Sequence, residues 1–233
     1  DAFLKDFVQL DGAKVLVHGG GKIASDVAAK LGIESKMIAG RRVTDQQMLD
    51  VVTMVYGGLV NKKIVAKIQA LGFDALGLSG ADLNVIKSKK RSQTPIDYGF
   101  VGDVEEINGQ MLMQLLHEGI TPVLAPLTHD GAGQMLNTNA DNIAGYTAIE
   151  LAKHISTELE LCFDLEAVMN GESIITEMNM LLYRHLTGIE VIKDGMIPKL
   201  DLGFMALNSG VKKVRIVGFD KINNPQKGTR LIK

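Results

Sequence analysis

The stretch Val15-Leu16-Val17-His18-Gly19-Gly20-Gly21 decides how this chain is expected to fold. Its three apolar residues predict a short buried strand, and residues 22–31 continue as a helix. Three glycines between a strand and a helix allow a sharp turn and a close approach of the backbone to a ligand. Backbone N–H groups exposed at a helix start attract anions. The spacings of a Walker A loop and of a dinucleotide fingerprint are absent, so an anion-binding turn and a tight turn without a ligand remain as alternatives.

The rest of the chain alternates strands and helices. The expected strands are 75–78, 121–125, 159–163, 213–217 and 229–232, and the expected helices are 2–10, 45–71, 109–118, 140–153, 177–187 and 198–209. Residues 84–107 predict a hairpin, whereas residues 126–139 predict a polar loop. Strands that alternate with helices indicate a mostly parallel sheet covered on both faces. We therefore expect an α/β fold, a three-layer αβα sandwich, formed by one domain over residues 1–233 with two lobes.

The composition narrows the classes of function. The 233 residues are 46% hydrophobic and carry a net charge of −2, so the basic excess typical of a nucleic-acid-binding surface is missing. A short basic cluster at 87–91 favours a solvated face, with steering of an anionic substrate as the alternative. No apolar run has the length of a transmembrane helix, and the first residues lack the plan of a signal peptide. The single cysteine, Cys162, predicts a buried structural thiol in a cytoplasmic protein.

Two segments place polar residues just before expected helices. In Gly40–Thr44, Arg42 can pair with both oxygens of a carboxylate or phosphate, although a surface arginine is the simpler interpretation. Thr44, with a glutamine three residues later, predicts a capping box for helix 45–71. Asn137–Asp141 offers two amides and a carboxylate, for which helix capping is the simpler interpretation and the arrangement of a substrate the alternative.

A further segment, Asp194–Lys199, ends on a lysine at the start of a helix. Pro198 suits the first helical turn, so Lys199 would lie at the positive helix end, where it can help to bind a phosphoryl group in transfer. A solvated lysine is the alternative. The other histidines have no metal-ligand spacing, and no Ser/His/Asp arrangement is present, so we expect no metal site built from side chains.

Together, in this order and at these separations, the four segments resemble the amino acid kinase family. The similarity extends from about residue 12 to the C-terminus. Within the family it is strongest to the branch that phosphorylates the side-chain carboxylate of an N-acylated glutamate in arginine biosynthesis. The combination of Arg42-Val43-Thr44 with Asn137–Asp141 separates this branch from carbamate and uridylate kinases. The resemblance implies an enzyme that uses ATP and Mg²⁺, accepts an N-acyl-L-glutamate such as N-acetyl-L-glutamate, and forms an acyl phosphate.

The resemblance also implies roles on the acceptor side of the reaction. Gly20 and Gly21 would present backbone N–H groups to the reacting carboxylate. Arg42 and Asn137 would hold the α-carboxylate of the acceptor. The lobe formed by about residues 1–155 would therefore bind the acyl amino acid.

On the donor side, the resemblance implies that Lys199 stabilises the transferring phosphoryl group. Asp141 would orient the catalytic lysines rather than act as a base, because a carboxylate acceptor is already ionised at neutral pH. Asp164 would begin the segment that lines the ATP site. The lobe formed by about residues 156–233 would therefore bind ATP.

The start of the chain departs from the family pattern. Members begin with a strand that ends in a Lys-x-Gly-Gly turn, and the lysine of that turn is the second cation that stabilises the phosphoryl group. We expect this segment to precede residue 1, as roughly 20 residues by ordinary element lengths, because a lost central strand would leave backbone groups without partners. The departure leaves two alternatives open: a non-catalytic amino-acid-binding regulatory protein on the same fold, and a kinase of this family with another carboxylate or carbamate substrate.

The acyl group and the assembly are implied only in outline. Acetyl is the usual group in this branch, and a larger acyl group such as succinyl would keep the same carboxylate contacts. Members form homodimers through the long helix after the Arg-Val-Thr segment. In helix 45–71 five apolar positions form a stripe that suits such an interface, with burial inside the monomer as the alternative; they are Met48, Val51, Val52, Val55 and Leu59.

Overall fold

The computed structural model describes residues 2–38, 41–193 and 195–233, which fall into two compact units. One unit is Gly12–Ile143, and the other combines the chain up to Asp11 with Ala144–Lys233. The expected division near residue 155 differs from this, because the structure divides within helix α6 (Ala140–Ala152) and joins the first residues to the C-terminal part. Each unit has its own sheets and its own buried apolar cluster.

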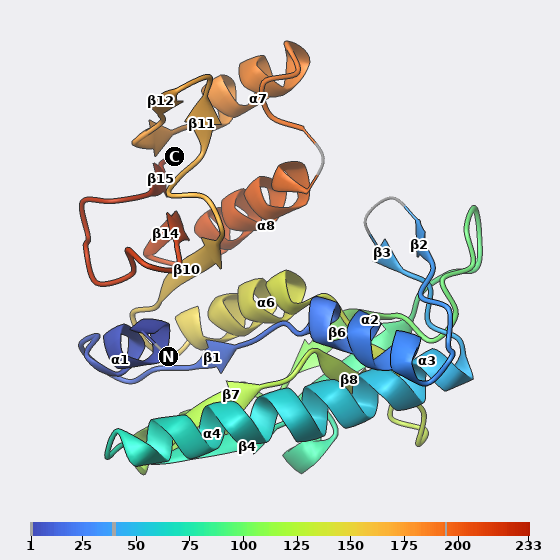
Figure 1. Ribbon diagram of the computed structural model, residues 1–233. Coiled ribbons are helices and arrows are strands. Elements are labelled where there is room, and N and C mark those ends of the chain that lie inside the picture. The colour runs from blue at the N-terminus through green and yellow to red at the C-terminus, as the bar shows by residue number, and fades with distance from the viewer. Residues whose placement is uncertain (1, 39–40, 194) are drawn as a thin grey trace. The chain divides into compact units, whose positions relative to one another are not determined.

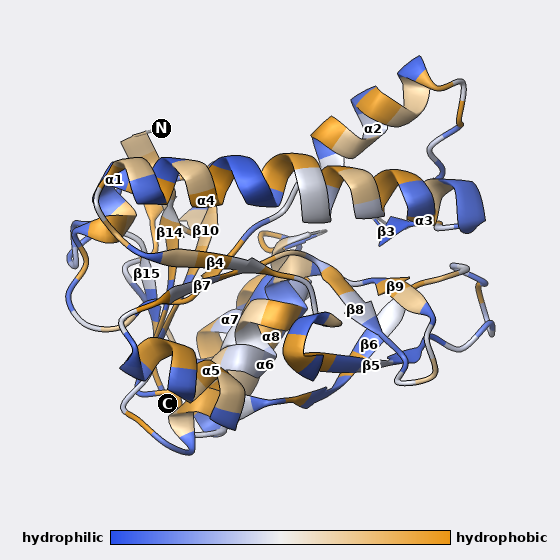
Figure 2. Ribbon diagram, turned by 90° about the horizontal axis from the view of Figure 1, so that it is seen from below, coloured by the Kyte–Doolittle hydropathy of each residue, from blue (hydrophilic) through white to orange (hydrophobic). Residues whose placement is uncertain are grey.

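The unit Gly12–Ile143 is built on a parallel sheet with helices on both faces. Its central strand β7 (Thr121–Leu124) pairs in parallel with β1 (Leu16–Val17) and with β4 (Ala75–Leu78). Figure 2 shows α4 (Asn61–Ala70) on one face of β4 and β7 and α5 (Gly109–His117) on the other. All four residues of β7 are buried, as expected for a parallel strand covered on both faces. The expected α/β class with helix layers around a parallel sheet is confirmed.

A second sheet of this unit is formed by the chain segments that follow the parallel strands β4 and β7. β5 (Ile86–Lys90) and β6 (Gly102–Ile107) make the expected hairpin, and β8 (Leu127–His129) pairs with β5. The polar loop expected at 126–139 is wrong, because β8 pairs with β9 (Met135–Asn137) across it. Leu127 and Leu136 are at most 1% exposed, so apolar side chains hold this hairpin to the core in spite of its polar turn. A smaller hairpin consists of β2 (Met37–Ile38) and β3 (Arg41–Arg42).

The helix expected at 45–71 is one helical run with an unusual middle. α3 (Gln46–Val52) passes into a π-helix, η1 (Thr53–Val60), and then into α4, and the run lies along β4 and β7 (Figure 1). The expected cap is wrong. Asp45 caps the helix, since its carboxylate accepts the N–H of Met48 at 2.8 Å. Thr44 is fully buried, and its backbone pairs with residues 98–100.

The apolar stripe expected at a dimer interface lies mostly inside this unit. Met48, Val51, Val52 and Val55 are each at most 2% exposed and belong to a cluster with side chains of the neighbouring helix and hairpin. Leu59 is 40% exposed. Burial within the monomer is therefore the correct interpretation for four of the five positions.

The second unit contains a four-stranded sheet packed against α8 (Met196–Asn208). β10 (Glu158–Phe163) and β14 (Lys213–Gly218) are parallel, β15 (Thr229–Leu231) runs antiparallel to β14, and β13 (Glu177–Met178) lies at the edge. The remaining elements are α1 (Ala2–Val8), α7 (Met180–Gly188), β11 (Met169–Asn170) and β12 (Ser173–Ile174). Within the described ranges of the whole chain, no helix has both the length and the apolar character to cross a membrane.

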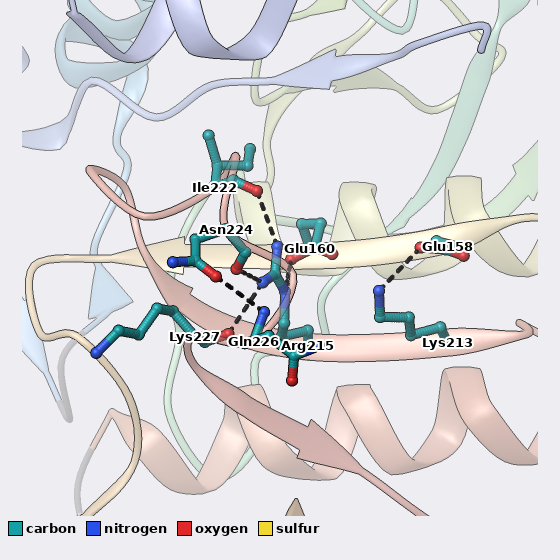
Figure 3. Close-up of polar contacts among 8 residues, drawn as sticks. All are labelled: Glu158, Glu160, Lys213, Arg215, Ile222, Asn224, Gln226 and Lys227. Carbon is teal, nitrogen blue, oxygen red and sulfur yellow. Dashed lines mark hydrogen bonds and ion pairs between the residues drawn. The ribbon is translucent and has the colours of Figure 1, made fainter. Parts of the chain in front are cut away.

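Two charge pairs join β10 to β14, and one of them is buried (Figure 3). The register sets Glu158 opposite Lys213 and Glu160 opposite Arg215. Arg215 is only 3% exposed, and its Nε donates a hydrogen bond of 2.6 Å to Glu160. Its terminal nitrogens donate to the backbone carbonyls of Ile222, Asn224 and Lys227. Arg215 therefore fixes the segment 219–228, which follows the carboxyl end of β14.

Replacing Arg215 with methionine is expected to lower the free energy of unfolding by about 3–5 kcal/mol, because Glu160 stays buried without its partner. Burial already raises the pKa of Glu160, and Arg215 opposes that effect. Without Arg215 the carboxyl binds a proton more tightly in the folded than in the unfolded state, so stability rises as the pH falls. The loss should therefore be smaller at about pH 5 than at about pH 8 in chemical denaturation.

Lys213→Met is the matched control for this measurement. Lys213 lies two residues earlier on the same strand, and its pair with Glu158 spans 3.4 Å with side chains that are 27% and 48% exposed. An exposed pair of this kind contributes less than about 1 kcal/mol. Equal losses for the two variants would contradict the role assigned to Arg215.

Candidate functional site

A pocket of about 230 Å³ lies at the glycine turn of the unit Gly12–Ile143. Four residues singled out in the sequence line it together, namely Gly20, Gly21, Arg42 and Asn137. They come from the start of α2 (Gly21–Lys30), from β3 and from β9. The fold of this unit thus gathers the residues expected on the acceptor side into one cavity.

The glycine turn leaves the start of α2 open to a ligand. Gly20 is the N-cap residue, and no side chain caps the helix there. The first N–H groups of a helix lack partners within the helix, and together with the helix dipole they favour an anion. A Cβ atom on Gly20 would lie 2.8 Å from Cδ1 of Tyr56, whereas one on Gly19 would meet no atom within 4 Å. Gly20 is therefore required by the close approach of the Tyr56 ring.

His18 braces the turn as a neutral side chain. Its Nδ1 lies 2.7 Å from the carbonyl oxygen of Gly19, and its Nε2 lies 3.1 Å from the amide nitrogen of Asn61. The Asn61 amide is a donor, so the hydrogen-bond network assigns the proton of His18 to Nδ1. Burial lowers the pKa of His18, which favours the same neutral form. His18 therefore holds the backbone of the turn and adds no charge to the pocket at neutral pH.

Arg42 is held by neutral oxygens around the start of α2. Its Nη2 donates to the carbonyl of Gly21 and to the hydroxyl of Ser25, each at 2.9 Å. Its Nη1 donates to the hydroxyl of Ser35. These partners carry no charge, so they orient the guanidinium without cancelling its positive charge. A carboxylate or phosphate in the pocket would meet that charge at a fixed position.

Asn137 and Asn139 have different roles in the structure. Asn137 is 9% exposed, and its Nδ2 donates to the hydroxyl of Thr44 at 2.9 Å, which fixes the orientation of the amide. Asn139 caps α6, because its side-chain oxygen accepts the N–H of Asn142 at 3.0 Å. Capping is thus the correct interpretation for Asn139 and wrong for Asn137. Asp141 lies in the first turn of α6, where the helix dipole favours a carboxylate, and its role toward lysines stays a prediction.

Three charged or aromatic side chains that line the pocket, those of Arg41, Tyr56 and Arg91, were not selected individually from the sequence. Arg41 adjoins Arg42, and Arg91 lies in the basic cluster for which steering of an anion was the alternative interpretation. The Nε of Arg91 donates to both carboxylate oxygens of Asp103 at 3.1 Å, which partly offsets its charge. Tyr56 gave no signal, because it lies in an apolar run of which Val51, Val52 and Val55 belong to the same buried cluster.

The second unit holds the residues expected on the donor side. Lys199 is in the first turn of α8, and Asp164 is exposed directly after β10. Phe219, which is 47% exposed, follows β14 and donates its N–H to the carbonyl of Phe163. Ligands of open parallel sheets bind outside the carboxyl ends of the strands. The ends of β10 and β14 therefore form a second candidate site.

Cys162 lies near the end of β10 beside this second candidate site. Burial raises the pKa of its thiol to about 11, although the charge of Lys199 opposes the shift. The thiol is therefore protonated at neutral pH and is not a nucleophile. Gly40 and Asp194, which open two of the segments chosen from the sequence, lie outside the described residues. Among the residues that the structure does describe, no three His, Cys, Asp or Glu side chains gather as metal ligands.

Known proteins resemble this chain in sequence and in fold. The model described as "Amino acid kinase family" matches residues 2–218. Acetylglutamate kinase of Parabacteroides distasonis is 53% identical over 232 residues, which cover 98% of this chain and 91% of the relative. The enzyme of the same name from Bacteroides thetaiotaomicron is 53% identical over 234 residues, 99% of this chain and 91% of the relative. The crystal structure of smu.665 from Streptococcus mutans superposes with a TM-score of 0.82 at 28% identity, covering 93% of this chain and 84% of that one.

Gly20→Ala is expected to lower the stability of the protein by about 1–3 kcal/mol, because the new methyl group overlaps the Tyr56 ring in a packed interior. Gly19→Ala is the neighbouring control, since the same methyl group enters open space there, and its effect should stay within about 0.5 kcal/mol. Thermal and chemical denaturation of the two variants measure the difference. Similar stabilities would show that Tyr56 does not constrain the turn.

Proposed function

The chain belongs to the amino acid kinase family, and on this premise we propose that it transfers the terminal phosphoryl group of ATP to the side-chain carboxylate of N-acetyl-L-glutamate or another N-acyl-L-glutamate in arginine biosynthesis. The observation that carries the proposal is the pocket at the glycine turn, which Gly20, Gly21, Arg42 and Asn137 line together. Relatives that match nearly the whole chain at about half identity are named acetylglutamate kinase, which supports the same substrate.

The acceptor side needs to hold an anion that reacts with another anion. The acceptor carboxylate is ionised at neutral pH and requires no general base. Backbone N–H groups at the start of α2, next to Gly20 and Gly21, would receive this carboxylate and offset its charge. Arg42 would bind the α-carboxylate, with Asn137 as a polar neighbour. Holding both carboxylates sets the nucleophilic oxygen in one position, which is the main source of catalysis in phosphoryl transfer.

The donor side would use the ends of β10 and β14. Lys199, in the first turn of α8, would stabilise the phosphoryl group in transfer, and Asp141 would orient the catalytic lysines. Asp164 would begin the wall of the ATP site. Magnesium, when bound, neutralises charge on the ATP phosphates. Since side-chain ligands do not gather in the described part of the chain, phosphate oxygens of ATP and water would supply most of its ligands.

The assembly and location follow from the same proposal. We expect a homodimer in the cytoplasm without a nucleic-acid or membrane partner. Met54 and Leu59, which are 56% and 40% exposed on the long helical run, are the apolar side chains there that an interface would cover. Light scattering of the purified protein measures the oligomeric state.

A coupled assay of ADP release tests the proposed activity on the full-length gene product. ADP should form with ATP and Mg²⁺ only when an N-acyl-L-glutamate is present, and removal of the metal with a chelator should abolish the reaction. A panel of N-acetyl-L-glutamate, N-succinyl-L-glutamate, free glutamate, aspartate and carbamate identifies the acceptor. The proposal would be overturned if carbamate were the only acceptor that gave ADP release, or if no acceptor of the panel gave any.

Lys199→Ala is expected to lower kcat by at least about 100-fold, because the charge that stabilises the transferring group is lost. Its thermal unfolding should match the wild type, since a partly exposed lysine makes little contribution to stability. Lys212→Ala is the control, as Lys212 is an exposed lysine before the opposite end of β14. Wild-type kcat in the Lys199 variant would remove this residue from the reaction.

A further inference from the structure

Two side chains of the π-helix η1, and that of the residue directly after it, contact the glycine turn. Tyr56 packs against Gly20, Val60 lies 3.6 Å from a Cβ built on Gly20, and Asn61 donates to His18. In an α-helix, side chains five positions apart point about 140° away from each other. A π-helix closes its hydrogen bonds over five residues, and the N–H of Asn61 indeed bonds to the carbonyl of Tyr56 as well as to that of Gly58. The wider turn therefore lets the side chains of Tyr56 and Asn61 both face the segment that follows the carboxyl end of β1.

Tyr56 is placed beside the arginine of the pocket as well as beside the glycine turn. The side chain is 5% exposed and lines the pocket. Burial raises the pKa of its phenol, while the charge of Arg42 and a hydrogen bond from it act in the opposite direction. The phenol therefore stays protonated at neutral pH. An arginine can only donate, so in a contact between these two side chains Arg42 is the donor, and the O–H of Tyr56 stays available as a donor.

The N–H groups of Arg42 are largely committed to the protein. They reach Gly21, Ser25 and Ser35, and a further contact runs from Nη1 to the sulfur of Met48 at 3.8 Å. A guanidinium has five N–H groups in total, so few remain for a ligand. A neutral hydroxyl that accepts from Arg42 becomes a stronger donor through polarisation along the chain of hydrogen bonds. Tyr56, which lines the pocket beside Arg42, would thus pass part of that positive charge on to a ligand.

We propose that the Tyr56 hydroxyl is a further substrate-binding group, which donates a hydrogen bond to the α-carboxylate of the acyl amino acid that Arg42 attracts. This inference rests on the proposed function for the identity of the ligand. It assigns Tyr56 two tasks with two different parts of the side chain. The ring supports the glycine turn through Gly20, and the hydroxyl contacts the ligand.

Isothermal titration with N-acetyl-L-glutamate, in the absence of ATP, separates these two tasks. Tyr56→Phe keeps the ring and removes the hydroxyl, so its thermal unfolding should match the wild type. Its Kd should rise about 10- to 100-fold, the range expected for one hydrogen bond to a charged group. In steady-state kinetics the KM for the acyl amino acid should rise by a similar factor, while the KM for ATP and kcat change by less than about threefold. A merely structural role would lower stability or kcat together with affinity.

A second ligand identifies the carboxylate that Tyr56 contacts. N-acetyl-L-isoglutamine carries an amide in place of the α-carboxylate and keeps the side-chain carboxylate. The effect of Tyr56→Phe on its Kd should be less than about fivefold, because a hydrogen bond to a neutral group contributes less. Tyr146→Phe removes the hydroxyl of a tyrosine that is 36% exposed in the other unit, and it should bind both ligands as the wild type does.

Each outcome of the titration decides the inference. An unchanged Kd for Tyr56→Phe, or equal losses for the two ligands, overturns the contact with the α-carboxylate while leaving the kinase activity intact. If the wild type binds N-acetyl-L-glutamate without turnover, the proposed activity is overturned. The Kd values of the wild type and of Tyr56→Phe can still be compared in that case. A wild type that does not bind N-acetyl-L-glutamate overturns both.

Discussion

The contact between the ring of Tyr56 and the backbone of Gly20 is the constraint on which the rest of the pocket depends. The ring approaches so closely that a Cβ atom at position 20 would lie 2.8 Å from it. Such packing fixes where the first turn of α2 begins, and therefore where its uncapped N–H groups point. On its other side α2 is held by Arg42, which donates to Gly21 and Ser25. The start of α2 is thus held in place by the ring of Tyr56 and by the guanidinium of Arg42, and both residues also line the cavity.

The sequence predicted the parts of the fold and pocket that depend on local rules. The glycine turn, the alternation of strands and helices, and a helix cap within Asn137–Asp141 follow from backbone freedom, hydrophobic period and short polar side chains. The predictions that were wrong concern segments whose structure depends on partners distant in the chain. In the sequence Thr44 resembles a helix cap. In the structure its backbone pairs with residues 98–100, and Asp45 caps the helix instead. The hairpin of β8 and β9 looks like a polar loop, because only Leu127 and Leu136 reveal its buried side.

Tyr56 shows the same limit within the pocket. In the sequence it is one apolar residue among several at helical spacing, and its neighbours Val52 and Val55 do enter the core. Tyr56 belongs to the same buried cluster but also lines the pocket, and the π-helix from Thr53 to Val60 contributes to the direction of its side chain. No propensity rule predicts eight residues of π-helix, because its stability comes from contacts made by its side chains with other elements. A residue whose direction depends on such a segment can be recognised only in the structure.

The protonation states of His18, Tyr56 and Arg42 around the pocket do not change near neutral pH. Burial keeps His18 neutral, and it keeps the phenol of Tyr56 protonated although Arg42 opposes the shift. Arginine stays protonated at any physiological pH. A reaction between two anions depends on the sum of the fixed positive groups that surround them, and a residue that titrates in that range would make the sum vary with pH. Backbone N–H groups, arginine and a neutral phenol supply instead a constant field. The buried imidazole beside the glycine turn therefore serves geometry rather than proton transfer, and binding of the acyl amino acid should depend on pH mainly through the ionisation of the ligand itself.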